Sequence, residues 1–390
     1  MINNVIIIHF HELTLKGKNR SWFEKTLLSN LRIHLLGLQY SNIINVAGRI
    51  VITGINISKR DLYKKHLHAL IGIRNFIFAY HCELNIDIIK QKAIELCRGI
   101  SNSGTFRVSS RRQNKNFQYT STEIDIMIGE SICKDLNWPV SLKKPDINIM
   151  IEIINNDAYL SIDKVDAYGG LPVGTGETAL SLISSGIDSP VASFNIIKRG
   201  VRLDYIHFHS APVTSRQSIY NVDSILDILC KYQMSCRLYL FSLLDVQNMI
   251  MENVKSKYWI ILFRRAMVRI ASSIAKENGY KVLISGESIG QVASQTLSNI
   301  VAIQDAATLP IIRPLSGMNK EQIINQANDI GTYDISIEPY EDCCSYFVPP
   351  NPETKSQLDR IRFIEDKIQI NKIINDYKEQ IEIKDIVYYE

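Results

Sequence analysis

Two short stretches of this 390-residue sequence hold residues whose types and spacing could do chemistry. The first is LISSGIDSP at 182–190, in which an apolar run ends in three small residues, followed by Asp188 and Ser189. Small residues let a backbone approach an anion closely, and a helix that starts there offers N–H groups. A tight turn that binds nothing is the alternative. The stretch matches neither GxxxxGK(S/T) nor GxGxxG, so two common phosphate-binding motifs are excluded.

The second stretch, PYEDCCSYF at 339–347, places Cys343 beside Cys344. Adjacent cysteines do not form an ordinary unstrained disulfide, and a metal site would need further ligands nearby. One cysteine could be a small core residue and the other incidental. The alternative is a reactive thiolate, which is a nucleophile and can carry sulfur as a persulfide.

Composition limits the class of protein. Seven cysteines are too few for a disulfide scaffold in a chain this long, and their odd number argues for a reducing compartment. There is no CxxC, so the spacing predicts neither a zinc nor an iron–sulfur site. No apolar run approaches the ~18 residues of a membrane span, and the start has no basic leader before an apolar core. These features predict a cytoplasmic protein without membrane contact or resident metal.

The elements that must position the two stretches change character along the chain. Residues 1–165 alternate strand and helix signals and end in a hairpin around Asn155-Asn156-Asp157, which indicates two small α+β modules. Residues 166–178 are rich in glycine and include a proline, which is typical of a linker. From 179 onward, strand–loop–helix repeats predict a doubly wound parallel sheet, whose ligands bind at the carboxyl ends of the strands.

Other polar residues fall at the predicted strand ends of this sheet. LISSGIDSP lies between its first strand and first helix, His207 and Phe208 end the second strand, and Gly286 and Gln295 surround another strand end. A lone histidine such as His207 is more often an ordinary buried or solvated residue. In FRRAM, either Arg264 or Arg265 could steady polyphosphate charge.

Charge is distributed unevenly between the two halves. Residues 1–170 hold 22 Lys and Arg against 15 Asp and Glu, whereas the remaining residues hold 22 against 25. A basic front half indicates a polyanionic partner, with solvated surface lysines as the alternative. The same choice applies to one basic cluster, which suits phosphate contact and base stacking because aromatic residues are interleaved with it. Its members are Arg107, Arg111, Arg112 and Lys115, with Phe117 and Tyr119.

The 182–190 loop resembles the SGGxDS loop of the PP-loop ATP pyrophosphatases, which split ATP between its α and β phosphates. Ser184, Gly186, Asp188 and Ser189 match that pattern. Ser185 stands where the second glycine of the family usually lies. A serine there costs about 1 kcal/mol or more in strain if the backbone needs a positive φ.

Taken in order, stretches along essentially the whole chain resemble the family of tRNA 4-thiouridine synthetases (tRNA uracil 4-sulfurtransferases), in the short form without a C-terminal rhodanese domain. They are ELTLKGKNRSWFEK, TFRVSSRRQNKNFQYTSTEI, LSLISSGIDSPVASFNIIKRG, HFHSAPVTS, FRRAMVRIA, ISGESIGQVASQTL, RPLSGMNKEQII and IGTYDISIEPYEDCCSYFVPPNP. The resemblance implies α+β N-terminal modules, namely a ferredoxin-like domain at 1–58 and a THUMP RNA-binding domain at 59–165. It also implies a linker at 166–178 and an α/β doubly wound PP-loop ATP pyrophosphatase domain at 179–390.

The resemblance further implies roles for particular residues. Asp188 matches the loop aspartate needed for adenylation, Cys343 matches the cysteine that bears the persulfide, and Cys344 is a candidate resolving partner. The basic cluster would contact tRNA. The implied ATP site comprises Leu182, Ile183, Ser184, Ser185, Gly186, Ser189, His207, Phe208, Arg264, Gly286 and Gln295.

The expected reaction is ATP-dependent and needs Mg²⁺. ATP would adenylate the C4 oxygen of a tRNA uridine (position eight in relatives), and sulfur loaded by a cysteine desulfurase would replace that oxygen to give 4-thiouridine. Relatives also suggest a homodimer and sulfur transfer to a ThiS-type carrier for thiazole synthesis. Two alternatives are another PP-loop tRNA-modifying enzyme and a non-catalytic tRNA-binding protein with a degenerate loop, the latter motivated by Ser185.

Overall fold

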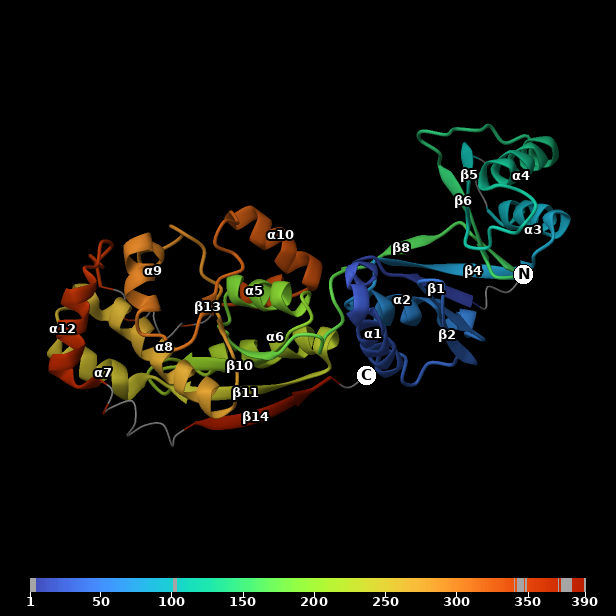
Figure 1. Ribbon diagram of the computed structural model, residues 1–390. Helices are drawn as coiled ribbons and strands as arrows, with labels where there is room; N and C mark the ends of the chain where they lie inside the picture. Colours follow the sequence, from blue (N-terminus) through green and yellow to red (C-terminus); the bar gives the residue numbers. More distant parts are fainter. Residues whose placement is uncertain are drawn as a thin grey trace. The chain divides into compact units, whose positions relative to one another are not determined.

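The computed structural model describes residues 5–100, 104–339, 341, 347, 349–370, 372 and 381–388. The chain forms two compact units, Met1–Pro172 and Val173–Glu390, which are shown in Figure 1 and described separately. The division falls inside the stretch whose composition predicts a linker. Cys343 and Cys344 lie outside the described residues.

The first unit is built on one eight-stranded sheet with the order β2-β3-β1-β4-β7-β6-β5, and β8 also pairs with β4. The predicted hairpin is present, with Ile154 opposite Asp157. The strands are β1 (Val5–His9), β2 (Asn42–Val46), β3 (Arg49–Thr53), β4 (Asn75–Glu83), β5 (Phe106–Arg112), β6 (Ile147–Ile154), β7 (Asp157–Ser161) and β8 (Lys164–Asp166). The helices are α1 (Arg20–His34), α2 (Arg60–Ala69), α3 (Ile86–Arg98) and α4 (Ser121–Leu136).

Hydrophobic cores on both faces of the sheet hold this unit together. Helices α1 and α2 bury Phe23, Leu27 and Tyr63 against Ile6 and Ile8 of β1, and this core involves β1, β3 and β4. The second core packs α3 and α4 against β5, β6 and β7. The alternation of Ile6 and Ile8 with Ile7 sends side chains to opposite faces of β1, and both faces are buried. The isoleucine-rich start of the chain is therefore a central strand.

A buried carboxylate links the two parts of the sheet. Glu152 of β6 is 2.6 Å from Nε2 of His9 in β1 and accepts a hydrogen bond from Nε of Arg49 in β3 at 2.5 Å. Burial alone would raise the pKa of Glu152, but hydrogen bonds and charges of His9 and Arg49 hold this pKa below its ordinary value. The carboxylate is therefore charged and paired, as a buried charge must be.

The second unit contains a six-stranded sheet with the order β13-β12-β9-β10-β11-β14. All neighbouring strands are parallel except β14, which runs antiparallel to β11, so the predicted doubly wound sheet is confirmed. The strands are β9 (Thr178–Leu182), β10 (Arg202–His209), β11 (Ser235–Ser242), β12 (Leu283–Ile284), β13 (Ile311–Ile312) and β14 (Glu382–Val387). The helices are α5 (Asp188–Ile197), α6 (Gln217–Gln233), α7 (Leu244–Asn253), α8 (Trp259–Glu277), α9 (Leu297–Gln304), α10 (Lys320–Ile330), α11 (Tyr333–Ser336) and α12 (Leu358–Ile368).

The strand order places a switch point beside β9. From β9 the chain proceeds to β10 and β11 on one side, whereas β12 and β13 are added on the other side. The loops that leave β9 and β12 therefore diverge, which opens a crevice at their carboxyl ends. LISSGIDSP follows β9 and Gly286 follows β12, so both stretches lie at this switch point.

A buried ion cluster joins α8, α9 and α12. The guanidinium of Arg265 in α8 is fully buried and donates to Asp305 at 3.1 Å and to Glu365 of α12 at 2.5 Å. Arg269 donates to the same oxygen of Glu365 at 2.7 Å. Burial alone would raise the pKa of Glu365, but these two arginines hold it below its ordinary value.

We expect Arg265→Met to lower the free energy of unfolding of the second unit by about 3 kcal/mol, because it leaves a buried carboxylate with one partner fewer. Since the pKa of Glu365 is lowered on folding, its contribution is present above the ordinary pKa, near 4.3, and is lost as pH falls below it. Urea titrations at pH 7 and at acid pH measure both effects. Arg360→Met, on the exposed face of α12, is the matched control. Equal stability of the two variants at pH 7 would contradict a stabilising role for the Arg265–Glu365 pair.

Candidate functional site

Ser189 holds the loop between β9 and α5 closed. Its hydroxyl accepts a hydrogen bond from the Ser184 N–H at 2.9 Å and donates to the Ser184 carbonyl at 3.1 Å. Ser193, one turn further along α5, donates to the Ser189 carbonyl at 2.9 Å and lies 2.9 Å from the Ser181 hydroxyl. The serines of this region thus fix the loop against the first turn of α5. The N–H groups of that turn have no partner within the helix, because the first four donors of a helix lie before its hydrogen-bond ladder begins.

Ser185 occupies its glycine position without strain. Its side chain is fully buried, and neither Ser185 nor Gly186 has a positive φ. The concern that a serine here forces a left-handed backbone therefore does not apply. The Ser185 hydroxyl finds no hydrogen-bond partner among the described residues. It is also the one predicted nucleotide-binding residue that does not line the pocket described below.

Gly286 brings the loop after β12 against the start of α5. A Cβ added to Gly286 would lie 2.7 Å from Cα of Ser189 and 2.8 Å from its backbone nitrogen. Both contacts are with backbone, so the neighbouring atoms cannot move aside without shifting the helix start. The glycine is required by this close approach, since its φ is not positive.

The two loops enclose a pocket with a volume of about 250 Å³ at the switch point. Ten of the eleven residues predicted to bind the nucleotide line it, together with Asp188. Leu182, Phe208 and Met267 supply apolar walls, whereas the loop residues and Arg264 supply polar groups. The remaining lining residues, which sequence reasoning did not single out, are Met267, Ser285, Glu287, Gln291 and Val292.

Asp188 is held by two side chains from other segments, one in a loop and one at the start of α10. Nζ of Lys320 lies 2.6 Å from one carboxylate oxygen, and Nε2 of Gln291 donates to the other at 2.8 Å. Asn319 caps α10 and forms a capping box with Gln322, which places Lys320 at the first helical position. The sequence NKEQ at 319–322 signals a capping box, but the sequence does not indicate that Lys320 lies beside Asp188.

A second ion pair supports the pocket floor. Glu287, which is almost fully buried, accepts a hydrogen bond from Nε of Arg313 at 2.6 Å. Arg313 follows β13, so the pair ties the loop after β12 to the loop after β13. Arg313 also donates to Gln304 of α9 at 2.8 Å. This pair holds the residue that directly follows Gly286.

His207 is a buried residue with a defined tautomer. Its Nδ1 lies 3.0 Å from the carbonyl oxygen of Ile183, which can only accept, so Nδ1 carries the proton. The ring thereby links the end of β10 to the end of β9. Burial, together with His207 and Arg216, lowers the pKa of the neighbouring His209 to about 4, so that ring is neutral near pH 7.

Arg264 and Arg265 point in different directions. Arg264 lines the pocket, whereas Arg265 is buried in the ion cluster with Asp305 and Glu365. Neighbouring residues on a helix point about 100° apart, so the cluster fixes the rotation that presents Arg264.

The residues on either side of Cys343 and Cys344 contact elements that carry the pocket. A carboxylate oxygen of Glu341 accepts a hydrogen bond from the Ser215 N–H at 3.1 Å, in the loop that follows β10. The Phe347 ring packs edge-on against Phe263 of α8, with ring centroids 6.3 Å apart. Phe263 precedes the pocket residue Arg264.

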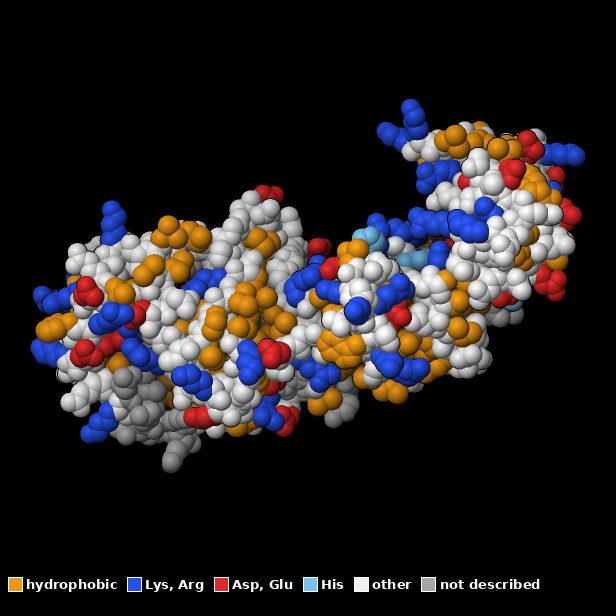
Figure 2. All heavy atoms as spheres, in the orientation of Figure 1, with side chains coloured by type: hydrophobic (Ala, Val, Ile, Leu, Met, Phe, Trp, Pro, Cys, Tyr) orange, Lys and Arg blue, Asp and Glu red, His pale blue; other side chains and the backbone are white. Residues whose placement is uncertain are grey.

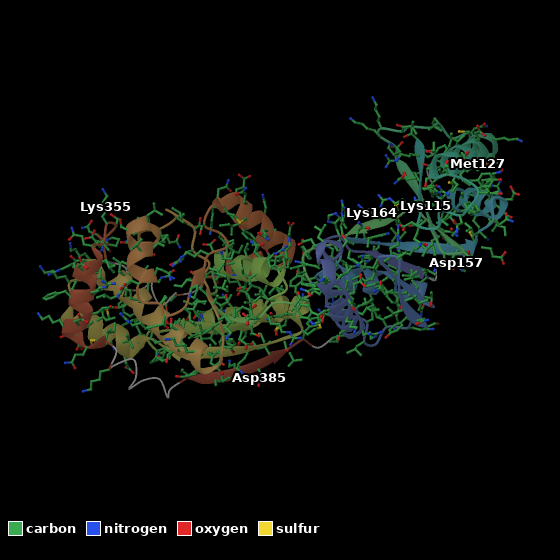
Figure 3. The ribbon with its side chains drawn as sticks, in the orientation of Figure 1. Lys115, Met127, Asp157, Lys164, Lys355 and Asp385 are labelled. Atoms are coloured by element: carbon green, nitrogen blue, oxygen red, sulfur yellow. The ribbon has the colours of Figure 1, made fainter. Side chains whose placement is uncertain are left out.

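The basic cluster of the first unit divides between the two faces of β5. Arg107 and Arg111 line a depression of about 300 Å³, whose wall also holds two further cations and a histidine: Arg74, Lys164 and His9. Figure 2 shows Lys, Arg and His side chains gathered on one face of this unit. Lys115, in the loop after β5, and Lys164 are labelled in Figure 3. Lys115 is exposed.

Arg112 lies on the opposite face of β5, as strand alternation requires. Its Nη1 donates to the carbonyl oxygen of Phe117 at 3.0 Å, and its Nε is buried. Phe117 and Tyr119 pack edge-on with centroids 5.6 Å apart and contact the core beneath α3 and α4. In this structure Arg112 and the two rings hold the 113–119 loop in place.

Family models of known proteins match residues in both units. The model of the family "Thiamine biosynthesis protein (ThiI)" matches residues 174–370, the THUMP domain model matches 83–163, and the ThiI ferredoxin-like domain model matches 5–76. The fold therefore comprises ferredoxin-like and THUMP domains followed by a PP-loop domain, as predicted. Fold and site together define an ATP pyrophosphatase-type enzyme that carries a THUMP domain.

Curated relatives identify the family. The probable tRNA sulfurtransferase of Thermoanaerobacter pseudethanolicus is 37% identical over 97% of this chain and 99% of its own length, and that of Halothermothrix orenii is 38% identical over 98% of both. The chain belongs to the tRNA sulfurtransferase family. A crystal structure of a 4-thiouridine synthetase–RNA complex with bound ATP matches with a TM-score of 0.85 and 34% identity, covering 98% of this chain and 99% of that one.

Among the described helices, none has the length and apolarity to cross a membrane.

We expect Gly286→Ala to destabilise the second unit by about 1–3 kcal/mol, because the added methyl group collides with the backbone at the start of α5. Gly317→Ala is the control, since its Cβ would meet nothing within 4 Å and its φ is not positive. Thermal unfolding of both variants measures the difference. If Gly286→Ala unfolds at the same temperature as Gly317→Ala and the parent chain, the two loops do not approach each other as closely as described.

Proposed function

We propose that this chain transfers sulfur to tRNA in an ATP-dependent reaction that converts a uridine, at position eight, into 4-thiouridine. The observation that carries the proposal is the pocket at the switch point of the second unit. It gathers the loop aspartate and ten of the expected nucleotide-binding residues from segments that are more than 100 residues apart in sequence. The matched 4-thiouridine synthetase, with its bound ATP and RNA, supports the same conclusion.

In this proposal the chemistry of the pocket lining gives ATP one orientation. The apolar walls formed by Leu182, Phe208 and Met267 suit an adenine ring, and the loop from Ser184 to Ser189 suits the phosphates. N–H groups at the start of α5 would contact the α-phosphate, where negative charge develops when the C4 oxygen of uridine attacks. Arg264 would add a charge-assisted contact.

Mg²⁺ belongs to the proposal because polyphosphate chemistry uses it as a counter-charge. Mg²⁺ usually binds one or two carboxylates together with the phosphates of the substrate. Asp188 and Glu287 are the carboxylates in the pocket lining, and Glu287 is already paired with Arg313. Asp188 would therefore hold the ion with the nucleotide. In the bound state Lys320 would be released from Asp188 to contact the departing pyrophosphate.

The decisive experiment is a sulfur-transfer assay with ATP, a tRNA transcript and a cysteine desulfurase, with 4-thiouridine read by its absorbance. We expect Asp188→Asn and Lys320→Ala each to lower the rate by about 10²–10³-fold, the usual cost of removing an electrostatic group from the transition state. Affinity for tRNA should stay within about twofold. Lys198→Ala, just past the far end of α5 and outside the pocket lining, should retain the parent rate. Near-normal turnover by Asp188→Asn would contradict the assignment of this pocket as the site of ATP-dependent sulfur transfer.

We propose that tRNA contacts the basic depression of the first unit. The guanidinium of Arg107 is fixed by two hydrogen bonds: its Nε donates to Asn148 at 3.2 Å and its Nη1 donates to the Leu142 carbonyl at 3.3 Å. Its remaining N–H groups, together with Arg111 and Lys115, would bind phosphates. Arg112 has a supporting role in this proposal, since its guanidinium is engaged with the loop backbone.

We expect the double variant Arg107→Ala, Arg111→Ala to bind tRNA at least tenfold more weakly in low salt. It should also reduce the slope of log Kd against log salt by about 2, because each phosphate contact releases about one counterion. Lys92→Ala is the control, as Lys92 pairs with Glu95 on α3 outside the depression. A salt slope equal to that of the parent chain would exclude the depression as the tRNA surface.

For the sulfur carrier we propose Cys343, with Cys344 as a resolving thiol. The described neighbours support this choice: Glu341 contacts the loop after β10 and Phe347 contacts α8, and both β10 and α8 contribute residues to the pocket. Other cysteines suit the task poorly. Burial raises the pKa of Cys82 to about 11 and that of Cys97 to about 12, and both side chains are enclosed in the first unit.

We expect Cys343→Ser to abolish single-turnover transfer of labelled sulfur to tRNA, because serine cannot carry a persulfide. Cys344→Ser should retain the first turnover and slow the later ones, since a resolving thiol acts only after transfer. Cys230→Ser, in a buried position, is the control. If Cys344→Ser loses the first turnover and Cys343→Ser keeps it, the two roles are reversed.

Further parts of the proposal concern partners. A cysteine desulfurase would supply the persulfide in the cytoplasm, where thiols stay reduced. The five cysteines among the described residues are free, in keeping with such a compartment. We also propose sulfur transfer to a ThiS-type carrier and homodimer formation, which membership of the family suggests. The competing proposal of a degenerate, non-catalytic loop loses its motivation, because Ser185 fits the loop without a positive φ.

A further inference from the structure

A rigid turn presents Gln291 to the pocket. Gly290 has a φ of +76°, and its N–H donates to the Gln295 carbonyl at 2.9 Å. The Gln295 N–H donates to the Val292 carbonyl at 2.9 Å, which closes the same turn from inside. Gln291 and Val292 therefore stand at the tip of a turn whose backbone is fixed, and both line the pocket.

The orientation of the Gln291 amide is fixed chemically. Its Nε2 group donates to Asp188 at 2.8 Å, and because a carboxylate can only accept, the NH₂ end must face Asp188. The carbonyl oxygen Oε1 is consequently directed away from Asp188. It makes no hydrogen bond with any residue that the structure describes. The pocket thus contains a hydrogen-bond acceptor that cannot be exchanged for a donor by flipping the amide.

The attacking base must come close to this acceptor. Reaction occurs at the α-phosphate, which the proposed function places beside Asp188, and Gln291 is in direct contact with Asp188. The reacting C4 oxygen of uracil adjoins N3–H, which is a donor. Cytosine has an unprotonated N3 at the same position, which is an acceptor. Two facing acceptors repel, so an acceptor of fixed orientation favours uracil.

We infer that Oε1 of Gln291 accepts a hydrogen bond from N3–H of the target uracil and so determines that the enzyme selects uridine. The inference rests on the proposed function. As the C4 oxygen attacks phosphorus, N3–H becomes more acidic, and the hydrogen bond to Oε1 strengthens on the way to the transition state. Val292, which is 50% exposed, offers an apolar contact to the face of the base.

The test uses the full chain with α,β-methylene ATP, which cannot be cleaved between its α and β phosphates. Kd is measured for two tRNA transcripts that differ only in U or C at the target position. We expect the parent chain to prefer uridine by about tenfold, the magnitude of one hydrogen bond. Gln291→Met, similar in size but without the acceptor, should bind both transcripts equally. Its Kd for the ATP analogue is measured in parallel, so that a change in base preference is separated from any change in nucleotide affinity.

Gln326→Met is the matched control, because Gln326 hydrogen-bonds Asn195 between α10 and α5 and does not line the pocket. It should keep the parent preference. The inference is overturned if the parent chain shows no preference, if Gln291→Met keeps it, or if Gln291→Met loses affinity for the ATP analogue to the same degree. A parent chain that makes no 4-thiouridine in the sulfur-transfer assay refutes the proposed function instead, so the two failures are distinguishable.

Discussion

The contact between the backbone of Gly286 and the first turn of α5 is the constraint on which the site depends. It joins two loops that leave the sheet in opposite directions, and it leaves no room for a side chain at residue 286. Three side-chain systems maintain it: the Ser189 hydroxyl closes one loop, the Glu287–Arg313 pair holds the other, and His207 links the ends of β9 and β10. The polar groups of the pocket have defined directions because these supports are largely buried.

The first unit shows a similar dependence on one buried charge. Glu152 connects three strands through His9 and Arg49, and two of these three residues also line the basic depression. A single carboxylate thereby supports a surface of opposite charge, and its own pKa is held down by the same neighbours. Glu152 and His9 thus belong both to the ion cluster and to the lining of the depression.

Much of this arrangement could be predicted from the sequence. Alternation of apolar runs and helical segments indicated the parallel sheet, and the order of motifs placed the pocket residues at strand ends, since parallel strands end at one edge. Contacts between distant loops could not be predicted. Lys320 lies 132 residues from Asp188, and neither composition nor periodicity reports such a pair. Arg112 was grouped with Arg107 and Arg111 because spacing alone does not reveal that its guanidinium is used by the 113–119 loop.

The last strand has a consequence for solubility. β14 runs antiparallel along β11 from Ser235 to Leu240 and covers backbone groups that would otherwise form an open sheet edge. The sequence of β11, SCRLYLFS, is rich in residues that favour intermolecular β-pairing. β14 itself carries charged Glu382, Lys384 and Asp385 at the new edge, and charges of this kind discourage pairing with another chain. A protein cut before residue 382 would therefore aggregate through β11 even if its nucleotide pocket were intact.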